Sequence, residues 1–565
     1  MRKGGSVSAL LALVLVAVAC TGNGVPQGSG TPGGSSPTAA PTGTTAKALA
    51  KEVCAQVAHE ILLRTWRGVF PGRSGDIQII PTFPNFVSGG LTHSTPYDYT
   101  QDVPMLLYAP GYVKPGVYPQ PITLADVAPT TAQFLKFDFQ APDGTAQTQA
   151  FLPAPDRALP RLVVTLIWDS GGLDVLNTWK NDWPYLRSLL PDGARFTHVS
   201  VGSSPSNTPT GHSIIGTGAF PMRTGMADEY IRMNARIQKP NENGPGFMLE
   251  PTLADLYDRA MGNAPLAGAI ATLAAHIMML GHGSEWGGGD KDIAITREKQ
   301  FAATAGAEST SWNLTTDMAP FYTLPSYVND LPPIDTYVRT LDQADGKIDG
   351  LWRTDSIAQL SNGFDTPART PFQTKLIETV IQHEGFGADA TPDLLYLNYK
   401  AIDTIGHLFS LNSPEMSDAL KYQDDALRQL VAFLNQQVGK GEWAMVLTAD
   451  HGTQYDPAVS HAFLIDLDTL TQDIQKTFDS DGDGVPLIQR VRPTEIWLND
   501  AELKDNGYTL TQVSQYLMNL TQSDTIKVGR TPDPATANDT VFSGAFPSSI
   551  LSKLPCLPEA RASKP

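Results

Sequence analysis

The chain has 565 residues, of which 41% are hydrophobic and 17% are charged, a composition typical of a globular protein with a large core. Its formal net charge of −18 at pH 7 excludes a nucleic-acid polymer as the main partner, because binding the phosphate backbone requires basic surface. Small phosphate esters are not excluded, since a local positive site attracts them whatever the net charge of the chain.

Residues 1–20 are predicted to be a lipoprotein signal peptide. Arg2 and Lys3 precede the apolar run VSALLALVLVAVA, which is too short to span a bilayer comfortably. Small residues come directly before Cys20, a pattern that resembles a bacterial lipobox, in which the cysteine carries the lipid. An ordinary cleaved signal peptide is the alternative. We therefore expect a protein on the extracytoplasmic face of the cell membrane, held there only by a lipid anchor on Cys20.

Residues 21–46 are expected to form a disordered linker. They are rich in Gly, Ser, Thr and Pro and cannot bury enough apolar surface to fold. The folded part then starts near Lys47. Cys54 and Cys556 lie near its two ends, and the sequence leaves open whether they form a disulfide or remain two buried thiols.

Apolar runs alternate with amphipathic helical patterns along the folded part. Helices are predicted over residues 51–66, 370–385 and 417–439. The predicted strands cover residues 105–110, 162–168, 292–295, 394–399 and 444–450. This alternation predicts an α/β fold with a largely parallel sheet, in which functional sites gather at the carboxyl ends of the strands.

Carboxylate and imidazole side chains follow three of these strands. Asp169 ends the strand at 162–168, Asp403 and His407 follow the strand at 394–399, and Asp450 with His451 ends the strand at 444–450. One strand-end aspartate is weak support for a site, because such residues often only cap helices. Three together, with Asp-x-x-x-His and Asp-His spacing, predict ligands for a divalent transition metal.

The stretch SNTPTGHSIIG adds a candidate nucleophile. Thr208 lies in a polar turn, with Gly211 and His212 just before an apolar helical run. A hydroxyl at a helix N-terminus is activated by a nearby cation and by the helix dipole, and the backbone amides there suit a phosphoryl oxygen. A plain helix cap is the alternative, and Thr210 is a second candidate nucleophile.

A strand followed by Asp, then Thr-x-x-Gly-His, then Asp-x-x-x-His and finally Ala-Asp-His-Gly resembles the alkaline phosphatase superfamily. The resemblance runs from about Arg161 to Gly452 and is closest to the type I phosphodiesterase/nucleotide pyrophosphatase-like branch. It implies an alkaline-phosphatase-like layered α/β/α fold with a central, mostly parallel sheet. It also implies a site for two zinc ions as cofactors.

The resemblance further implies which residues bind the two ions. Asp169, Thr208, Asp450 and His451 match the ligands of one zinc, whereas Asp403 and His407 match the other, which takes a third ligand from a His. Two histidines are candidates for that third ligand. His461 follows His451 closely, and His93 lies in GLTHSTPYDY, although Thr-His-Ser stands where the family has Gly-His-Gly.

The His93 block normally follows the Asp-His-Gly motif in this branch, but here it comes first. The chain therefore resembles a circularly permuted relative, a change that is tolerated when chain ends lie close together. We favour His93 as the displaced third ligand. Residues 47–160 would then be the permuted N-terminal part of the catalytic fold, and residues 161–565 the main catalytic domain with C-terminal elements.

Two other positions bear on the resemblance. PTFPNF around Thr82 mimics a nucleophile motif, but it follows no strand that carries an Asp, so we reject it. The monoesterase branch has a Lys-x-Arg pair where this chain has Ala274 and His276. Because two cations that would hold a dianionic phosphoryl group are missing, diesters or pyrophosphates are favoured over monoesters as substrates.

We therefore expect an extracytoplasmic zinc-dependent phosphodiesterase or nucleotide pyrophosphatase that acts on small phosphate esters through a phosphoryl-threonine intermediate. A phosphomonoesterase and a catalytically silent binding lipoprotein of the same fold are the alternatives. A sulfatase is disfavoured, because its modified nucleophile has no counterpart. The oligomeric state is not predicted. FDSDGDGVPLIQR matches the front half of a calcium loop, but Arg490 stands where Glu is needed, so calcium stays open.

Overall fold

The computed structural model describes residues 45–153, 158–240, 244–297 and 311–562. The predicted signal peptide, Cys20 and nearly all of the predicted linker lie outside these residues. None of the helices within the described ranges has both the length and the hydropathy that crossing a bilayer requires.

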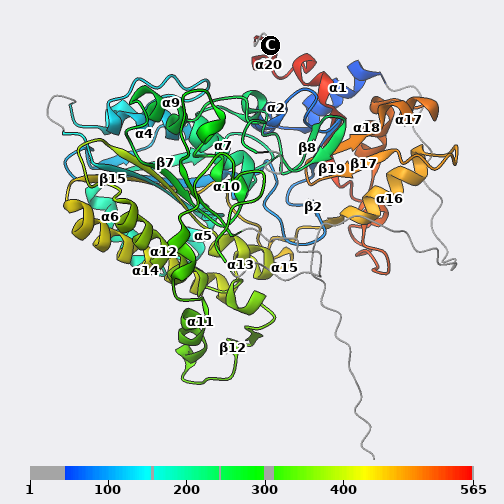
Figure 1. Ribbon diagram of the computed structural model, residues 1–565. Helices are drawn as coiled ribbons and strands as arrows, with labels where there is room; N and C mark the ends of the chain where they lie inside the picture. The colour runs from blue at the N-terminus through cyan, green and yellow to red at the C-terminus, as the bar shows by residue number, and fades with distance from the viewer. Residues whose placement is uncertain (1–44, 154–157, 241–243, 298–310, 563–565) are drawn as a thin grey trace, which may run out of the picture. The chain divides into compact units, whose positions relative to one another are not determined.

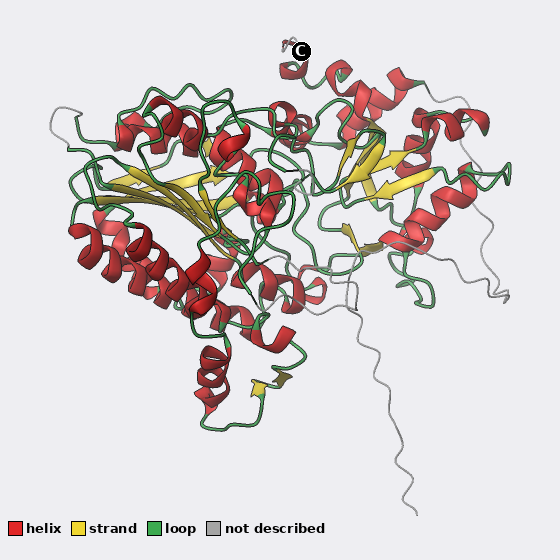
Figure 2. Cartoon of the chain, viewed as in Figure 1, coloured by secondary structure: helices red, strands yellow, loops and turns green. Residues whose placement is uncertain are grey.

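Nine strands form the main sheet, in the order β11-β10-β14-β6-β15-β3-β7-β4, with β5 beside β7. Figure 2 shows strands in yellow and the helices around them in red. Every neighbouring pair is parallel except the two pairs that include β3. The strands are β3 Asp102–Tyr108, β4 Gly116–Tyr118, β5 Ile122–Thr123, β6 Leu162–Trp168, β7 Ala194–Ser200, β10 Ala267–Ile270, β11 Ile293–Ile295, β14 Asp393–Tyr399 and β15 Trp443–Thr448. The predicted mostly parallel sheet is confirmed.

Helices cover both faces of the main sheet (Figure 1). In β6, Val163 and Ile167 pack into one core, whereas Leu162, Val164 and Leu166 pack into the other. This alternation follows from the two-residue period of a strand. One face is covered by α4 Val127–Leu135, α7 Thr208–Thr217 and α9 Leu253–Ala260, and the other by α6 Pro184–Leu189, α12 Arg369–Glu384 and α14 Pro414–Leu434. The predicted three-layer α/β/α fold is therefore confirmed.

The helix predicted over residues 51–66 is two helices in the structure. α1 (Ala46–Gln56) and α2 (His59–Gly68) are separated by two residues with extended backbone. Each helix buries its own apolar residues, Leu49 and Val53 in α1 and Leu62 in α2. α1 begins at Ala46, which the sequence assigned to the linker.

A second sheet combines both ends of the folded chain. β1 (Ile77–Pro81) lies between β18 (Glu495–Leu498) and β19 (Phe542–Pro547), and β17 (Ile488–Val491) pairs with β18. All these pairs are antiparallel. The disulfide that the sequence left open is present, because Cys54 and Cys556 are joined with their Cα atoms 5.7 Å apart. The two ends therefore lie side by side, as a permuted chain requires.

Removing this disulfide is expected to destabilise the protein. Replacing Cys54 and Cys556 together with Ser should lower the free energy of unfolding by about 2–5 kcal/mol, because the bridge restricts the unfolded chain across 502 residues of sequence. Urea unfolding followed by circular dichroism measures the change. Reductant should destabilise the parent protein to the same extent and leave the variant unaffected; equal midpoints for parent and variant would contradict the expectation.

Candidate metal centre

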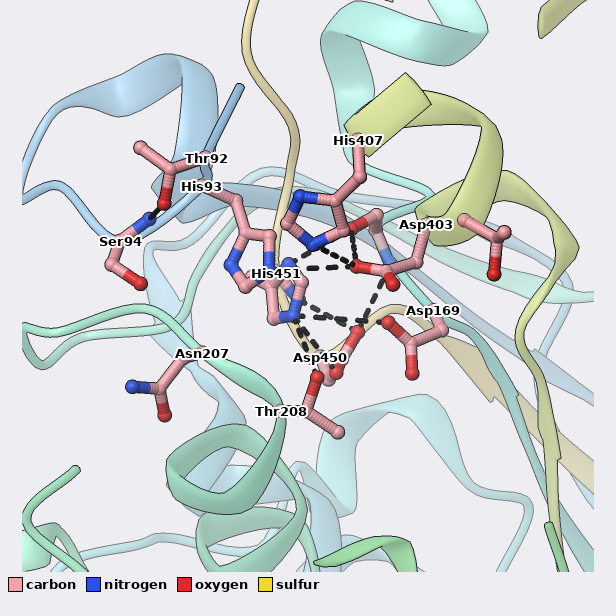
Figure 3. Close-up of polar contacts among 12 residues, drawn as sticks. Thr92, His93, Ser94, Asp169, Asn207, Thr208, Asp403, His407, Asp450 and His451 are labelled. Carbon is pink, nitrogen blue, oxygen red and sulfur yellow. Dashed lines mark hydrogen bonds and ion pairs between the residues drawn. The ribbon is translucent and has the colours of Figure 1, made fainter. Parts of the chain in front are cut away.

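The carboxyl ends of three adjacent strands bring acidic side chains together (Figure 3). β14, β6 and β15 are neighbours in the sheet; Asp169 follows β6 directly, and Asp450 comes two residues after the end of β15. Asp403 lies in the first turn of α13 (Ala401–Phe409), the helix that follows β14. All three carboxylates are buried, with at most 3% of the residue exposed. Such a concentration of buried negative charge requires cations nearby.

Thr208 is the first residue of α7, next to the same cluster. Asn207 caps the helix by accepting a hydrogen bond from the Thr210 backbone amide. Thr208 Oγ1 lies 3.4 Å from His451 Nε2 and 3.2 Å from Lys400 Nζ. The predicted position of Thr208 at a helix N-terminus is therefore what the structure has, and its hydroxyl faces the charged cluster (Figure 3).

The structure brings His93, and not His461, to Asp403. His93 Nε2 lies 3.5 Å from Asp403 Oδ1, and His407 Nε2 lies 3.6 Å from the same oxygen. The His93 ring also stacks on His451, with the ring centroids 3.8 Å apart. His461 is exposed and belongs to none of the described clusters of metal-binding side chains.

Three imidazoles in the cluster are held in one tautomer by main-chain oxygens. The Nδ1 atoms of His93, His407 and His451 lie 2.9 Å from the carbonyl oxygens of Ser206, Leu91 and Gly452, respectively. A carbonyl oxygen only accepts, so each neutral ring carries its proton on Nδ1 and has its lone pair on Nε2. This is the usual arrangement of a histidine that binds a metal through Nε2.

The donor atoms form two overlapping groups, each of which could hold a metal ion. Ligand atoms of His93, Asp403 and His451 lie within 4.8 Å of one another, and so do those of Asp169, Asp450 and His451. Asp450 Oδ2 is buried and forms no hydrogen bond in the structure. Imidazole nitrogen and carboxylate oxygen are ligands that zinc and other divalent transition metals take in proteins.

Charges within the cluster shift the pKa values of its side chains. Burial raises the pKa of Asp169 and of Asp403, but the Lys400 ammonium and the neighbouring histidines together outweigh burial and hold both below their ordinary value. Burial lowers the pKa of His93, which is therefore neutral. Burial also lowers the pKa of His451, yet the carboxylates, Asp450 first, outweigh it and raise that pKa to about 9.

Four further side chains support the predicted ligands, and the sequence analysis missed all of them. His276 Nδ1 accepts from the Leu273 amide, so its proton is on Nε2, 3.2 Å from Asp169 Oδ2. Asn398 Nδ2 donates to the same oxygen over 2.9 Å. The other two are Ser170, which donates to Asp403 Oδ1, and Lys400. Ser170 and Lys400 each lie within three residues of a predicted ligand, and that proximity was the only signal in the sequence.

The positions that the sequence analysis set aside lie elsewhere. Thr82 follows β1 in the second sheet, where its amide donates to Val541 O. The Thr210 hydroxyl lies 3.0 Å and 2.9 Å from the carbonyl oxygens of Pro205 and Asn207, so its proton is directed to the backbone.

The acidic loop at residues 479–484 gains a partner that its local sequence does not supply. Glu502 of α17 (Asp500–Asp505) lies with Asp479 and Asp481, so that their ligand atoms are within 4.8 Å of one another. The Asn506 side chain bridges Glu502 and the loop. Exposed acidic groups gather in this way with and without an ion, so we assign none.

A family model for type I phosphodiesterase/nucleotide pyrophosphatase matches residues 163–537. Alkaline phosphatase PafA of Elizabethkingia meningoseptica is 23% identical over 419 residues, which cover 64% of this chain and 72% of that protein. A protein of Myroides odoratus named calcium-transporting ATPase is 23% identical over 391 residues, covering 61% and 70% of the two chains. The crystal structure of wild-type PafA matches with a TM-score of 0.47 and 18% sequence identity, covering 69% of this chain and 84% of that one.

Proposed function

Because this chain belongs to the type I phosphodiesterase/nucleotide pyrophosphatase family, we propose that it is a zinc-dependent enzyme that hydrolyses phosphoric diesters or pyrophosphates through a phosphoryl-threonine intermediate. Phosphoric ester hydrolysis follows from the family itself. The metal, the nucleophile and the substrate class are inferred from the site.

The observation that carries the proposal is the position of the Thr208 hydroxyl. It lies beside a cluster of three buried carboxylates and three histidines, whose Nδ1 atoms are held by main-chain oxygens so that Nε2 is the nitrogen that faces a cation. A hydroxyl is a weak nucleophile unless a base or a cation activates it. The cluster supplies the ligands for such a cation at the N-terminus of α7, where the helix dipole favours negative charge.

Two ligand sets follow from the contacts. Asp169, Thr208, Asp450 and His451 would hold one zinc ion, and His93, Asp403 and His407 the other. When bound, the zinc ions lower the pKa of a hydroxyl and stabilise negative charge on phosphoryl oxygens. The three carboxylates carry less negative charge than the four positive charges of two divalent ions, which favours an anionic substrate.

The reaction then takes two steps. Thr208 Oγ attacks phosphorus in line, so that an Oγ–P bond forms while the bond from phosphorus to the leaving oxygen breaks. The leaving oxygen takes the electron pair of that bond, and the hydroxyl proton of Thr208 passes to solvent. Water next attacks the phosphoryl-threonine, which releases the phosphate product and restores the Thr208 hydroxyl with a proton from water.

The substrate class rests on what replaces the Lys-x-Arg pair of monoesterases. Ala274 and His276 are both buried, and burial lowers the pKa of His276, so this side chain is neutral. Neither residue provides a cation for a dianionic phosphoryl group. A phosphomonoesterase is the second candidate, and the relatives named alkaline phosphatase favour it.

A paired assay separates the two candidates. The zinc-loaded protein should hydrolyse bis-p-nitrophenyl phosphate with a higher kcat/KM than p-nitrophenyl phosphate. A preference for the monoester would assign the second function. Failure to hydrolyse either ester, in protein that holds zinc, would overturn both.

We also propose that the enzyme is anchored by a lipid on Cys20 at the extracytoplasmic face. Support comes from the lipobox-like sequence before Cys20 and from the Cys54–Cys556 disulfide, which persists in an oxidising compartment. In cells, Cys20→Ala should abolish incorporation of radiolabelled palmitate and release the protein from the membrane fraction. Retention of label in that variant would refute the anchor.

Replacing each of the two candidate histidines in turn with Ala decides which one is the third ligand of the Asp403 centre. His93→Ala should lower the zinc content from about two ions to about one per chain and weaken metal binding at that centre by at least about 100-fold, because even an indirect partner of a ligand is worth about 10–100-fold. Mass spectrometry of dialysed protein gives the zinc content. His461→Ala is the matched control and should keep both ions; if it loses one instead, the assignment is reversed.

A further inference from the structure

Lys400 places a positive charge inside the proposed catalytic centre. It lies between the end of β14 and the start of α13, and only 8% of the residue is exposed. Its ammonium group lies between two carboxylates, those of Asp169 and Asp403.

The ammonium group makes three contacts, and a lysine has three N–H donors. Nζ lies 2.7 Å from Asp403 Oδ2, 3.0 Å from Asp169 Oδ1 and 3.2 Å from Thr208 Oγ1. The first two contacts join one carboxylate from each proposed zinc site. The third contact is to the oxygen that attacks phosphorus.

These contacts leave one oxygen of Asp403 available to a cation, whereas both oxygens of Asp169 already have partners in the protein. Asp403 directs Oδ2 to Lys400, while its other oxygen, Oδ1, faces the Nε2 atoms of His93 and His407. Asp169 Oδ2 lies near His276 and Asn398, so the oxygen near Lys400 is Oδ1. Lys400 and a cation at the Asp403 site therefore use different carboxylate oxygens.

From this geometry we propose that Lys400 binds a nonbridging oxygen of the phosphoryl group that Thr208 attacks. In a reactive complex, phosphorus lies about 3–3.5 Å from the attacking oxygen. A nonbridging oxygen on that phosphorus can then take over the N–H that contacts Thr208 Oγ1, because the ammonium lies 3.2 Å from the attacking oxygen. Lys400 keeps its proton throughout and acts as a fixed charge.

Lys400 would thus supply one positive charge where monoesterases have the two of their Lys-x-Arg pair, so the site still has one cation fewer for a dianionic group. Lys400 lies in the segment that follows β14, whereas Ala274 and His276 lie in the segment that follows β10. The positive charge would therefore come from a different strand end than in the monoesterases. The inference rests on the proposed phosphoryl transfer to Thr208, but binding of an anion by Lys400 does not require turnover. The two can therefore be tested separately.

The test compares Lys400→Met and Lys400→Arg with Lys375→Met, which removes an exposed lysine outside the site. Zinc content, inhibition by inorganic phosphate, and the kcat and KM for bis-p-nitrophenyl phosphate are measured for each variant. Lys400→Met should keep about two zinc ions, lower kcat/KM by about 10²–10³-fold and weaken phosphate inhibition by about tenfold or more. Lys400→Arg should recover part of both losses, and Lys375→Met should match the parent.

Zinc affinity distinguishes substrate binding from a merely structural role. Removing a cation that contacts two ligand carboxylates should leave zinc binding unchanged or tighter, as measured by chelator competition. Loss of zinc together with activity, or unchanged phosphate inhibition, would overturn the role of Lys400. Should Lys400→Met fail to fold, Lys400→Gln with the same measurements replaces it. Turnover that persists in Thr208→Ala would instead refute the phosphoryl-threonine step and leave the phosphate measurement valid.

Discussion

Thr208→Ala is expected to lose nearly all turnover of phosphate esters while it still binds zinc. The variant removes the only side-chain hydroxyl that contacts both His451 and Lys400 among the described residues. Removal of a covalent nucleophile typically costs about 10³-fold or more in kcat. Steady-state assays with bis-p-nitrophenyl phosphate measure the loss, and zinc analysis checks that the centre is intact.

Two variants control this result. Thr208→Ser keeps a hydroxyl at the same position and should retain activity within about tenfold of the parent, since serine also serves as a nucleophile. Thr82→Ala changes the rejected nucleophile motif in the second sheet and should match the parent. Full activity in Thr208→Ala, or loss of activity in Thr82→Ala, would remove the basis of the proposed mechanism.

Removal of zinc with a chelator is expected to abolish activity and lower the melting temperature without unfolding the protein at 25 °C. An ion that binds only the folded state at a free concentration of 1,000 times its Kd stabilises that state by about 4 kcal/mol. For a chain of this length, each kcal/mol of lost stability lowers Tm by roughly 1 °C. The metal-free protein should stay folded, because Lys400 and protonated His451 already neutralise part of the carboxylate charge.

The same experiment has a defined pH dependence. In the metal-free protein the pKa of His451 is raised to about 9, so at pH 7 its ring carries a proton that must leave before Nε2 binds zinc. Zinc affinity should therefore increase as pH rises towards about 9 and decrease below it, and calorimetry in buffers of different ionisation enthalpy should detect proton release. Activity that survives complete removal of metal, or zinc binding that does not change with pH, would contradict this account.

The sequence predicted the parts of the fold that repeat a local pattern. The strand over residues 162–168 is β6 without change, and the predicted helix over 370–385 is α12 shifted by one residue. Strand-end residues could be named as ligands because parallel strands carry their carboxyl ends to one edge. His93 was predicted from its neighbouring motif, and its contact with Asp403 depends on a fold that joins distant segments.

Other features could not be predicted because they depend on packing between distant segments. Period and composition do not distinguish a parallel strand from an antiparallel one, so the direction of β3 was not predicted. A His between alanine and isoleucine, such as His276, gives no sign that it will reach Asp169 across the sheet. In the sequence, Lys400 resembles an ordinary lysine at the end of a strand. Only the folded structure shows that three acceptors surround it.

The main-chain oxygens that fix the tautomer of the three imidazoles have an evolutionary consequence. The oxygens of Leu91, Ser206 and Gly452 remain whatever side chains those positions acquire. The side chains at these positions can therefore change during evolution without changing which imidazole nitrogen faces the cations, provided that the backbone path of each loop is kept. Insertions and deletions in those loops, more than point substitutions, should mark the lineages in which this chemistry has been lost.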